Sequence, residues 1–230
     1  RFDNFTCANS ICSPSRATIL TGQYSHRNGV LGLNGSINDD SPQYPVELQK
    51  AGYQTWLVGK WHLKSQPKGY DKHMVVKGQG KYFNPTFSGS EGTWKREGYS
   101  TDVYTDIAMD WLKARDKRKP FLLSLQFKAP HHDYGHAARY DKLLEGVTVA
   151  EPPTLYEDVR NSDSMLKREF LKRTKFHMLH SGGNPKQKKE GNAYYYRHLK
   201  DDPPNAMWKH DPKSEKDRIH VAYQHMIHKY

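Results

Sequence analysis

The chain has 230 residues, of which 35% are hydrophobic and 12% aromatic, and this composition is compatible with a folded globular core. No run of residues is apolar for long enough to span a membrane. The net charge is +11, and a basic surface attracts polyanions such as sulfated substrates, anionic membranes or nucleic acid. Because neither an RNA-binding aromatic signature nor zinc-finger spacing accompanies the charge, nucleic acid is not an expected partner.

The first predicted element is a short helix over residues 14–21. Pro14 suits a helix entry, the segment RATIL is compatible with a helix, and Gly22 suits its end. This helix places Cys12 at its positive end, where a reactive group faces backbone N–H donors. The other cysteine, Cys7, is expected to be a small buried residue, since two cysteines make neither a zinc ligand set nor a disulfide framework.

Two helix and strand pairs follow along the chain. The segment YPVELQKAG predicts a helix that ends at Gly52, and YQTWLVG predicts a strand that ends at Gly59. Thr101 is expected to cap a helix over 102–119, and FLLSLQF predicts a strand buried on both faces. Between the pairs, residues 70–100 are rich in glycine and aromatic residues and predict an irregular excursion. The order of elements predicts an α/β fold in which helices flank a mostly parallel sheet.

The remainder of the chain gives weaker patterns. Residues 1–160 are expected to form the core part of one domain, and residues 161–230 a basic, loop-rich continuation with 15 basic and 8 acidic side chains. The segment MLKREFLKRTKF is compatible with a basic helix, and the final SEKDRIHVAYQHMIHKY predicts an amphipathic helix. Because no strand follows this helix, the chain is expected to be part of a longer polypeptide.

Three segments in chain order resemble the type I sulfatases of the alkaline phosphatase-like superfamily. They are CSPSRATILTG, GKWHL and APHH, and the resemblance is strongest over residues 5–135. It implies a partial sulfatase-like sandwich fold and a Cys12 that a separate enzyme oxidises to formylglycine. Without that modification, Cys12 would be a thiol nucleophile activated by the helix N-terminus and by Arg16.

The resemblance also implies roles for the polar residues of these segments. A hydrated aldehyde at position 12 would attack sulfur with one hydroxyl, release the alcohol, and expel sulfate with the second hydroxyl. Arg16 would hold the modified side chain, and Lys60 would contact the sulfate and the diol. His62 would take the proton during sulfate release, and His131 would lie near the leaving oxygen. Residues 13–15 would serve mainly as the recognition sequence for the modifying enzyme.

Type I sulfatases bind a calcium ion, and formylglycine at Cys12 is the one ligand of that ion expected within this chain. The family's other ligands are an Asp pair on a strand before the cysteine and an Asp with an Asn or similar residue on a later strand. The chain is therefore expected to be a fragment that lacks both segments and is inactive alone. Expected partners are a sulfated carbohydrate and a formylglycine-generating or anaerobic sulfatase-maturating enzyme. The family implies a periplasmic or secreted location.

Two alternatives to sulfate ester hydrolysis stay open. The formylglycine signature also occurs in related phosphonate and phosphodiester hydrolases, so the transferred group could be phosphoryl. In a noncatalytic polyanion-binding module, the basic tail would hold a sulfated glycan and Cys12 would stay a thiol. The sequence leaves open whether His132 and Asp133 belong to the site.

Overall fold

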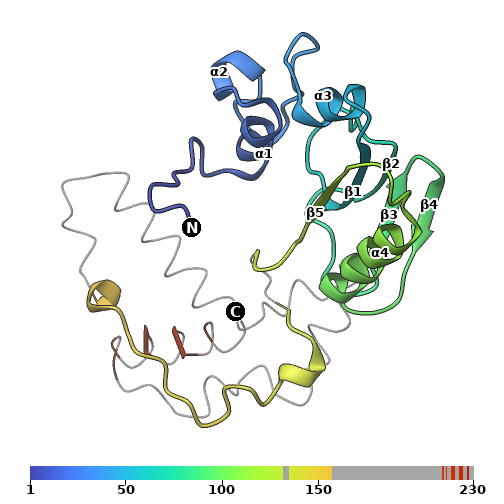
Figure 1. The fold of residues 1–230 in the computed structure, drawn as a ribbon. Helices are drawn as coiled ribbons and strands as arrows, with labels where there is room; N and C mark the ends of the chain where they lie inside the picture. The colour runs from blue at the N-terminus through green and yellow to red at the C-terminus, as the bar shows by residue number, and fades with distance from the viewer. Residues whose placement is uncertain are drawn as a thin grey trace. The chain divides into compact units, whose positions relative to one another are not determined.

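The structure, a computed structural model, describes residues 1–131 and 135–156 and several single positions near the C-terminus, which are 214, 216, 219, 220, 223, 224 and 227. The chain divides into two compact units, Arg1–Ala129 and Pro130–Tyr230. The first unit is a sheet with helices packed on both faces (Figure 1). Its elements in chain order are α1 (Cys12–Thr21), α2 (Ser25–Asn28), α3 (Tyr44–Lys50), β1 (Gln54–Lys60), β2 (Lys72–Val76), β3 (Thr86–Gly89), β4 (Gly92–Lys95), α4 (Ser100–Ala114) and β5 (Phe121–Gln126).

The five strands form one mixed sheet in the order β4-β3-β2-β1-β5. Strand β1 pairs in parallel with β2 on one side and with β5 on the other, whereas β2, β3 and β4 pair antiparallel. The carboxyl ends of β2, β1 and β5 therefore lie at the same edge of the sheet, where functional groups gather in open α/β sheets. The predicted α/β class, a sheet flanked by helices, is confirmed. The sheet is mixed rather than mostly parallel, because two of its four strand pairs are antiparallel.

The prediction of an irregular excursion over residues 70–100 is wrong, because three of the five strands lie there. Each is only four or five residues long, which is too short for a hydrophobic period to stand out from the glycine and aromatic residues. Strand β3 requires glycine at position 89, since a Cβ there would lie 2.0 Å from the carbonyl oxygen of His73. Glycine in this segment marks close strand packing as well as turns.

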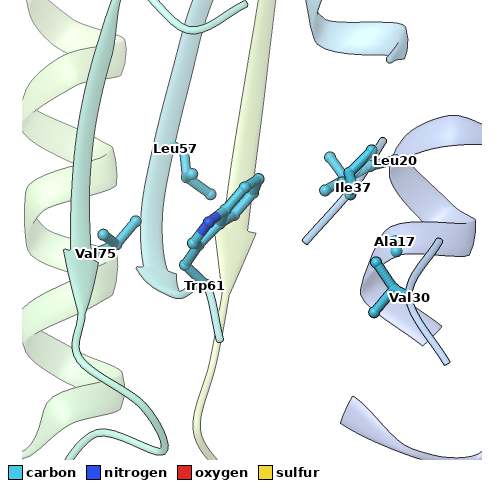
Figure 2. Close-up of a cluster of buried hydrophobic side chains, with 7 residues drawn as sticks. All are labelled: Ala17, Leu20, Val30, Ile37, Leu57, Trp61 and Val75. Atoms are coloured by element: carbon cyan, nitrogen blue, oxygen red, sulfur yellow. The ribbon is translucent and has the colours of Figure 1, made fainter. Parts of the chain in front are cut away.

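Two hydrophobic clusters cover the two faces of the sheet. Neighbouring residues of β1 divide between them, since Leu57 belongs to one cluster and Val58 to the other, as expected from the alternation of side chains along a strand. Figure 2 shows the first cluster between the strands and α1; its buried members are Ala17, Leu20, Val30, Ile37, Leu57, Trp61 and Val75. The second lies under α4 and contains Val58, Val76, Phe87, Val103, Tyr104, Ile107 and Ala108. Burying each large apolar side chain contributes about 1.5–3 kcal/mol.

Helix α1 differs from the prediction at its start. It begins at Cys12 rather than at residue 14, so the cysteine is itself the first helical residue. The predicted stop is correct: Gly22 adopts a left-handed conformation with φ of 67° and donates its N–H to the carbonyl of Thr18. Cys7 is exposed, which contradicts the prediction that it is buried.

Helix α4 and strand β5 also depart in detail from the sequence patterns. Tyr99 is the residue before α4, no side chain caps the helix, and the predicted cap Thr101 lies inside it. The helix ends at Ala114, well before Pro120, at a residue followed by extended backbone. Strand β5 pairs in parallel as predicted, but it is the outermost strand on its side of the described sheet and only Ser124 in it is fully buried. Its apolar run therefore does not reflect burial on both faces.

The second unit contains the short 3₁₀ helices η1 (Ala138–Tyr140) and η2 (Pro153–Tyr156). In the final segment, where an amphipathic helix was predicted, positions 216, 219, 220, 223, 224 and 227 are helical. Ile219 is buried there with Leu155. The predicted basic helix near residue 170 lies outside the described residues, and in the described part of the chain no helix has the length and apolar character to cross a bilayer.

Candidate active site

The candidate site lies at the sheet edge formed by the carboxyl ends of three adjacent parallel strands. Lys60 is the last residue of β1, and Gln126 is the last residue of β5. Gln79 follows β2 by three residues. The register pairs Gly59 with Gln126 and Lys60 with Val76, which brings these segments to the same level. Helix α1 adds its N-terminus to this edge through a contact with Lys60.

Cys12 and Lys60 form the centre of the site. The Nζ atom of Lys60 lies 3.5 Å from Sγ of Cys12 and donates to it, although 48 residues separate the two in the chain. The lysine is only 2% exposed, and the thiol is partly buried. Since Cys12 is the first residue of α1, it also lies at the positive end of the helix dipole, beside backbone N–H groups that have no partner within the helix.

Arg16 lies one helical turn after Cys12, so both side chains fall on the same face of α1. Its Nη1 donates to the carbonyl oxygen of Lys60 at 2.7 Å and to the side-chain oxygen of Gln126. The half-buried guanidinium therefore joins α1 to the ends of β1 and β5. This contact fixes Arg16 and, through the backbone of Lys60, the residue that reaches the thiol.

His62 has the most constrained geometry of the predicted site residues. Its φ is 54°, which is in the left-handed region that non-glycine residues seldom adopt. The hydroxyl of the fully buried Ser13 donates its one proton to the His62 carbonyl at 2.5 Å, and the Leu33 carbonyl lies farther away, at 3.3 Å from the same hydroxyl oxygen. The Nδ1 atom of His62 is buried and has no partner among the described residues. The surrounding structure thus holds the backbone of His62 in this conformation.

The site is electropositive and poorly solvated. Burial lowers the pKa of both Arg16 and Lys60, and the nearby Cys12 opposes the shift in each case. Burial also lowers the pKa of His62, and the charges of Lys60, Arg16 and Lys64 lower it further. No carboxylate among the described residues forms an ion pair with Lys60 or Arg16. A buried lysine beside a half-buried arginine, with no acidic partner among the described residues, is suited to bind an anion.

The described residues do not form a calcium site. Among them, no group of three or more His, Cys, Asp or Glu residues is placed to hold a metal ion, and the near neighbours of Cys12 are cations rather than oxygen donors. Calcium requires six to eight oxygen ligands. That Cys12, once modified, contributes a calcium ligand stays a prediction.

The structure thus brings Cys12, Arg16 and Lys60 into one contact network, and Ser13 links the His62 backbone to the same helix turn. His131 belongs to the second unit, and its role stays a prediction. His132 and Asp133 lie outside the described residues.

Sequence reasoning missed Gln79 and Gln126, the acceptors for the two cations. Gln126 is the second-to-last residue of the predicted strand FLLSLQF, and its place near the end of a strand could have pointed to a site residue. Gln79 lies in the segment over residues 70–100 that was expected to be irregular, and it was not assigned to the site.

Comparisons with known proteins agree with this fold. The profile of the family described as Sulfatase matches residues 1–197. The chain is 41% identical over 161 residues to the N-acetylglucosamine-6-O-sulfatase of Bacteroides thetaiotaomicron, covering 69% of this chain and 29% of that protein. It is 29% identical over 172 residues to the human N-acetylglucosamine-6-sulfatase, covering 64% of this chain and 31% of that protein.

A solved structure described as BT4656 in complex with its substrate D-glucosamine-2-N,6-O-disulfate is also similar. It has a TM-score of 0.76 and 30% identity, with 100% of this chain and 51% of that chain covered. The chain has an α/β sheet with a cysteine and two cations at its edge, and one family profile matches most of its length. Together these features define the class of protein. The chain belongs to the sulfatase family, and it spans about 30% of the length of the curated relatives that it matches.

Proposed function

We propose that this chain carries the reaction centre of a sulfuric ester hydrolase that acts on sulfated glycans, with a 6-O-sulfated glucosamine unit as the substrate class. The glycan class is supported by the N-acetylglucosamine-6-O-sulfatase that is 41% identical. It is also supported by the similar structure that holds a glucosamine disulfate. The single observation that carries the reaction class is the contact of Lys60 with Cys12 at the N-terminus of α1, with Arg16 fixed beside it.

The nucleophile in this proposal is formylglycine made from Cys12. The surroundings fit it, because Lys60 donates to the atom that would become oxygen, and the start of α1 offers further donors. The aldehyde, when hydrated, supplies a hydroxyl that attacks sulfur and a second hydroxyl that expels the sulfate. The chain's own residues then orient this group and balance the negative charge.

Each cationic or basic residue has a distinct task. The ammonium of Lys60 contacts both the nucleophile and a sulfate oxygen, and the Arg16 guanidinium stabilises charge that develops on the other oxygens. The depressed pKa of His62 keeps its imidazole neutral near neutral pH, so that it can accept a proton when sulfate is released. His131 donates a proton to the leaving alcohol oxygen. The absence of a carboxylate partner for the cations, among the described residues, leaves them available to the sulfate.

A maturation enzyme and an exported location complete the proposal. A formylglycine-generating or anaerobic sulfatase-maturating enzyme would convert Cys12. A periplasmic or secreted location is supported by relatives named as extracellular sulfatases in Drosophila melanogaster and Caenorhabditis elegans. Calcium, which the family implies, would need ligands beyond those that the described residues supply.

The test compares the full-length protein that contains this segment with the 230-residue chain, each coexpressed with a formylglycine-generating enzyme. We expect the full-length protein to release sulfate from glucosamine 6-sulfate, the matched phosphate ester to react much more slowly, and the 230-residue chain to be inactive. Conversion of Cys12 lowers the intact mass by about 18 Da.

The matched control is the second cysteine. Cys12→Ala should lower turnover by at least about a thousandfold. Cys7→Ala should leave it unchanged because Cys7 is exposed. Full activity of the Cys12→Ala variant would refute the proposed function. Faster cleavage of the phosphate ester would instead support a phosphoryl-transfer enzyme, and an unmodified, inactive protein that binds sulfated glycan would support a noncatalytic module.

A further inference from the structure

The two cations of the site are each held by the amide oxygen of a glutamine. Lys60 donates from Nζ to Oε1 of Gln79, and Arg16 donates from Nη1 to Oε1 of Gln126. These contacts join residues 19 and 110 positions apart in the chain. Since Gln79 follows β2 and Gln126 ends β5, the two acceptors come from the strands that flank β1 on either side.

Backbone geometry brings Gln126 close to β1. Gly59 pairs with Gln126 in the parallel register, and a Cβ at Gly59 would lie only 2.0 Å from the Gln126 carbonyl oxygen. The lack of a side chain at position 59 therefore allows the end of β5 to approach the site. The same residue that pairs by its backbone with β1 uses its side chain to hold Arg16.

Each cation keeps donors free for a ligand. Arg16 uses Nη1 for both of its hydrogen bonds, so its Nε and Nη2 have no partner within the described part of the chain, and this edge can bind an oxyanion in a bidentate manner. Lys60 has three ammonium donors and uses one for Cys12 and one for Gln79. One N–H of Lys60 therefore has no acceptor among the described residues.

A glutamine acceptor differs from a glutamate in charge rather than in shape. A carboxylate at either position would bind the cation more strongly, but it would also neutralise the charge that attracts an anion. Without any acceptor, a long lysine or arginine side chain would lose its fixed orientation. A neutral amide meets both requirements, because it orients the cation and leaves its charge intact.

We infer that Gln79 and Gln126 are positioning residues that fix Lys60 and Arg16 for a sulfate group without neutralising them. The inference rests on the proposed function, because it takes sulfate as the anion that the two cations bind. The inference explains how the site favours an anion: it keeps a net positive charge because the acceptors for Lys60 and Arg16 are neutral amides.

The experiment uses the full-length protein with four variants of nearly constant side-chain size, Gln79→Glu, Gln126→Glu, Gln79→Met and Gln126→Met. We measure the dissociation constant of inorganic sulfate by calorimetry, kcat and KM for glucosamine 6-sulfate, and the melting temperature. Each Glu variant should weaken sulfate binding and raise KM by roughly tenfold or more, with an unchanged or higher melting temperature. Each Met variant should lower kcat by roughly tenfold, with a smaller change in KM.

The matched control is Gln66→Glu, which makes the same change of net charge at an exposed side chain and should leave all values within about twofold. Sulfate binding by the Glu variants equal to that of the parent would overturn the inference, and so would a parent that binds no sulfate. A parent that binds sulfate but hydrolyses no ester would refute the proposed function alone, since the binding measurements still decide the role of the glutamines. If a Glu variant does not fold, unchanged kcat in the corresponding Met variant overturns the inference at that position.

Discussion

His62 shows how much constraint a single residue of this site carries. Its left-handed backbone is unfavourable for a residue with a side chain, yet the Ser13 hydroxyl holds its carbonyl and the ring nitrogen Nδ1 is buried. A backbone held in a strained conformation by its surroundings is typical of functional positions. Ser13 therefore does more than form part of a recognition sequence, which was the role expected for it.

Replacing Ser13 with alanine tests this structural role. The change removes the hydroxyl that donates to the His62 carbonyl and should lower the free energy of unfolding by about 0.5–1.5 kcal/mol, together with a fall in kcat. Urea denaturation and steady-state kinetics measure the two effects. Intact mass gives the extent of Cys12 conversion; normal stability and kcat per converted molecule would show that Ser13 serves only in recognition.

The pKa of His62 gives a second prediction at this scale. In the proposed mechanism His62 accepts a proton as neutral imidazole, so activity should be lost as the pH falls through the pKa of His62, and the lowered pKa should extend activity to more acidic pH. Lys64→Gln removes one of the charges that lower this pKa, so the acid limb of kcat/KM should move to higher pH. Lys113→Gln, an exposed lysine on α4, should not move it. A shift of the acid limb to lower pH in Lys64→Gln would contradict the assignment.

At the scale of elements, the packing of β1 against β5 determines the site. Gly59 has φ of 111° and leaves no space for a Cβ. Gly59→Ala should therefore combine backbone strain with a clash against the β5 backbone and cost at least about 3 kcal/mol.

Gly22→Ala is the matched comparison for this element. Its φ is also positive, at 67°, but nothing lies within 4 Å of the added Cβ, so it should cost only about 1 kcal/mol. Chemical denaturation of the two variants separates steric clash from strain. Equal losses would mean that the strand contact is not what constrains Gly59.

The elements that the sequence predicts best are those with a long pattern or a clear stop. Helix α1, helix α3 and strand β1 were predicted to within two residues at their ends, because a glycine lies at or near the end of each and β1 has an apolar centre over residues 56–58. The short strands β2, β3 and β4 were missed because their pairing is decided by neighbours in space rather than by local pattern. Burial of β5 was overestimated for the same reason, since an apolar run does not reveal its place in the sheet.

At the scale of the whole molecule, the site residues that were predicted lie in local sequence patterns, whereas those that were missed depend on neighbours in space. Cys12, Arg16, Lys60 and His62 were predicted from motifs that can be read in a linear sequence. Their partners Gln79 and Gln126 depend on the register of three parallel strands, and no local pattern encodes that register.

The overall charge and the site charge should respond differently to salt. The net charge of +11 attracts a sulfated polysaccharide at long range, and salt screens such attraction. Raising NaCl from about 50 to 300 mM should weaken binding of the 230-residue chain to a highly sulfated polysaccharide by roughly tenfold or more. The KM of the full-length protein for a monosulfated sugar should change by less than about threefold, because Lys60 is almost fully buried. Affinity chromatography and kinetics give the two values; equal salt dependence would mean that surface charge governs both.

Arg16 and Gln126 are in contact but lie 110 positions apart in the chain, and this separation determines how long after Arg16 its partner is synthesised. At about 5–20 residues per second, a ribosome takes roughly 6 to 22 s to make the second partner after the first. Throughout that interval Arg16 lacks its contact with Gln126, so the enzyme proposed to modify Cys12 would act before β5 docks.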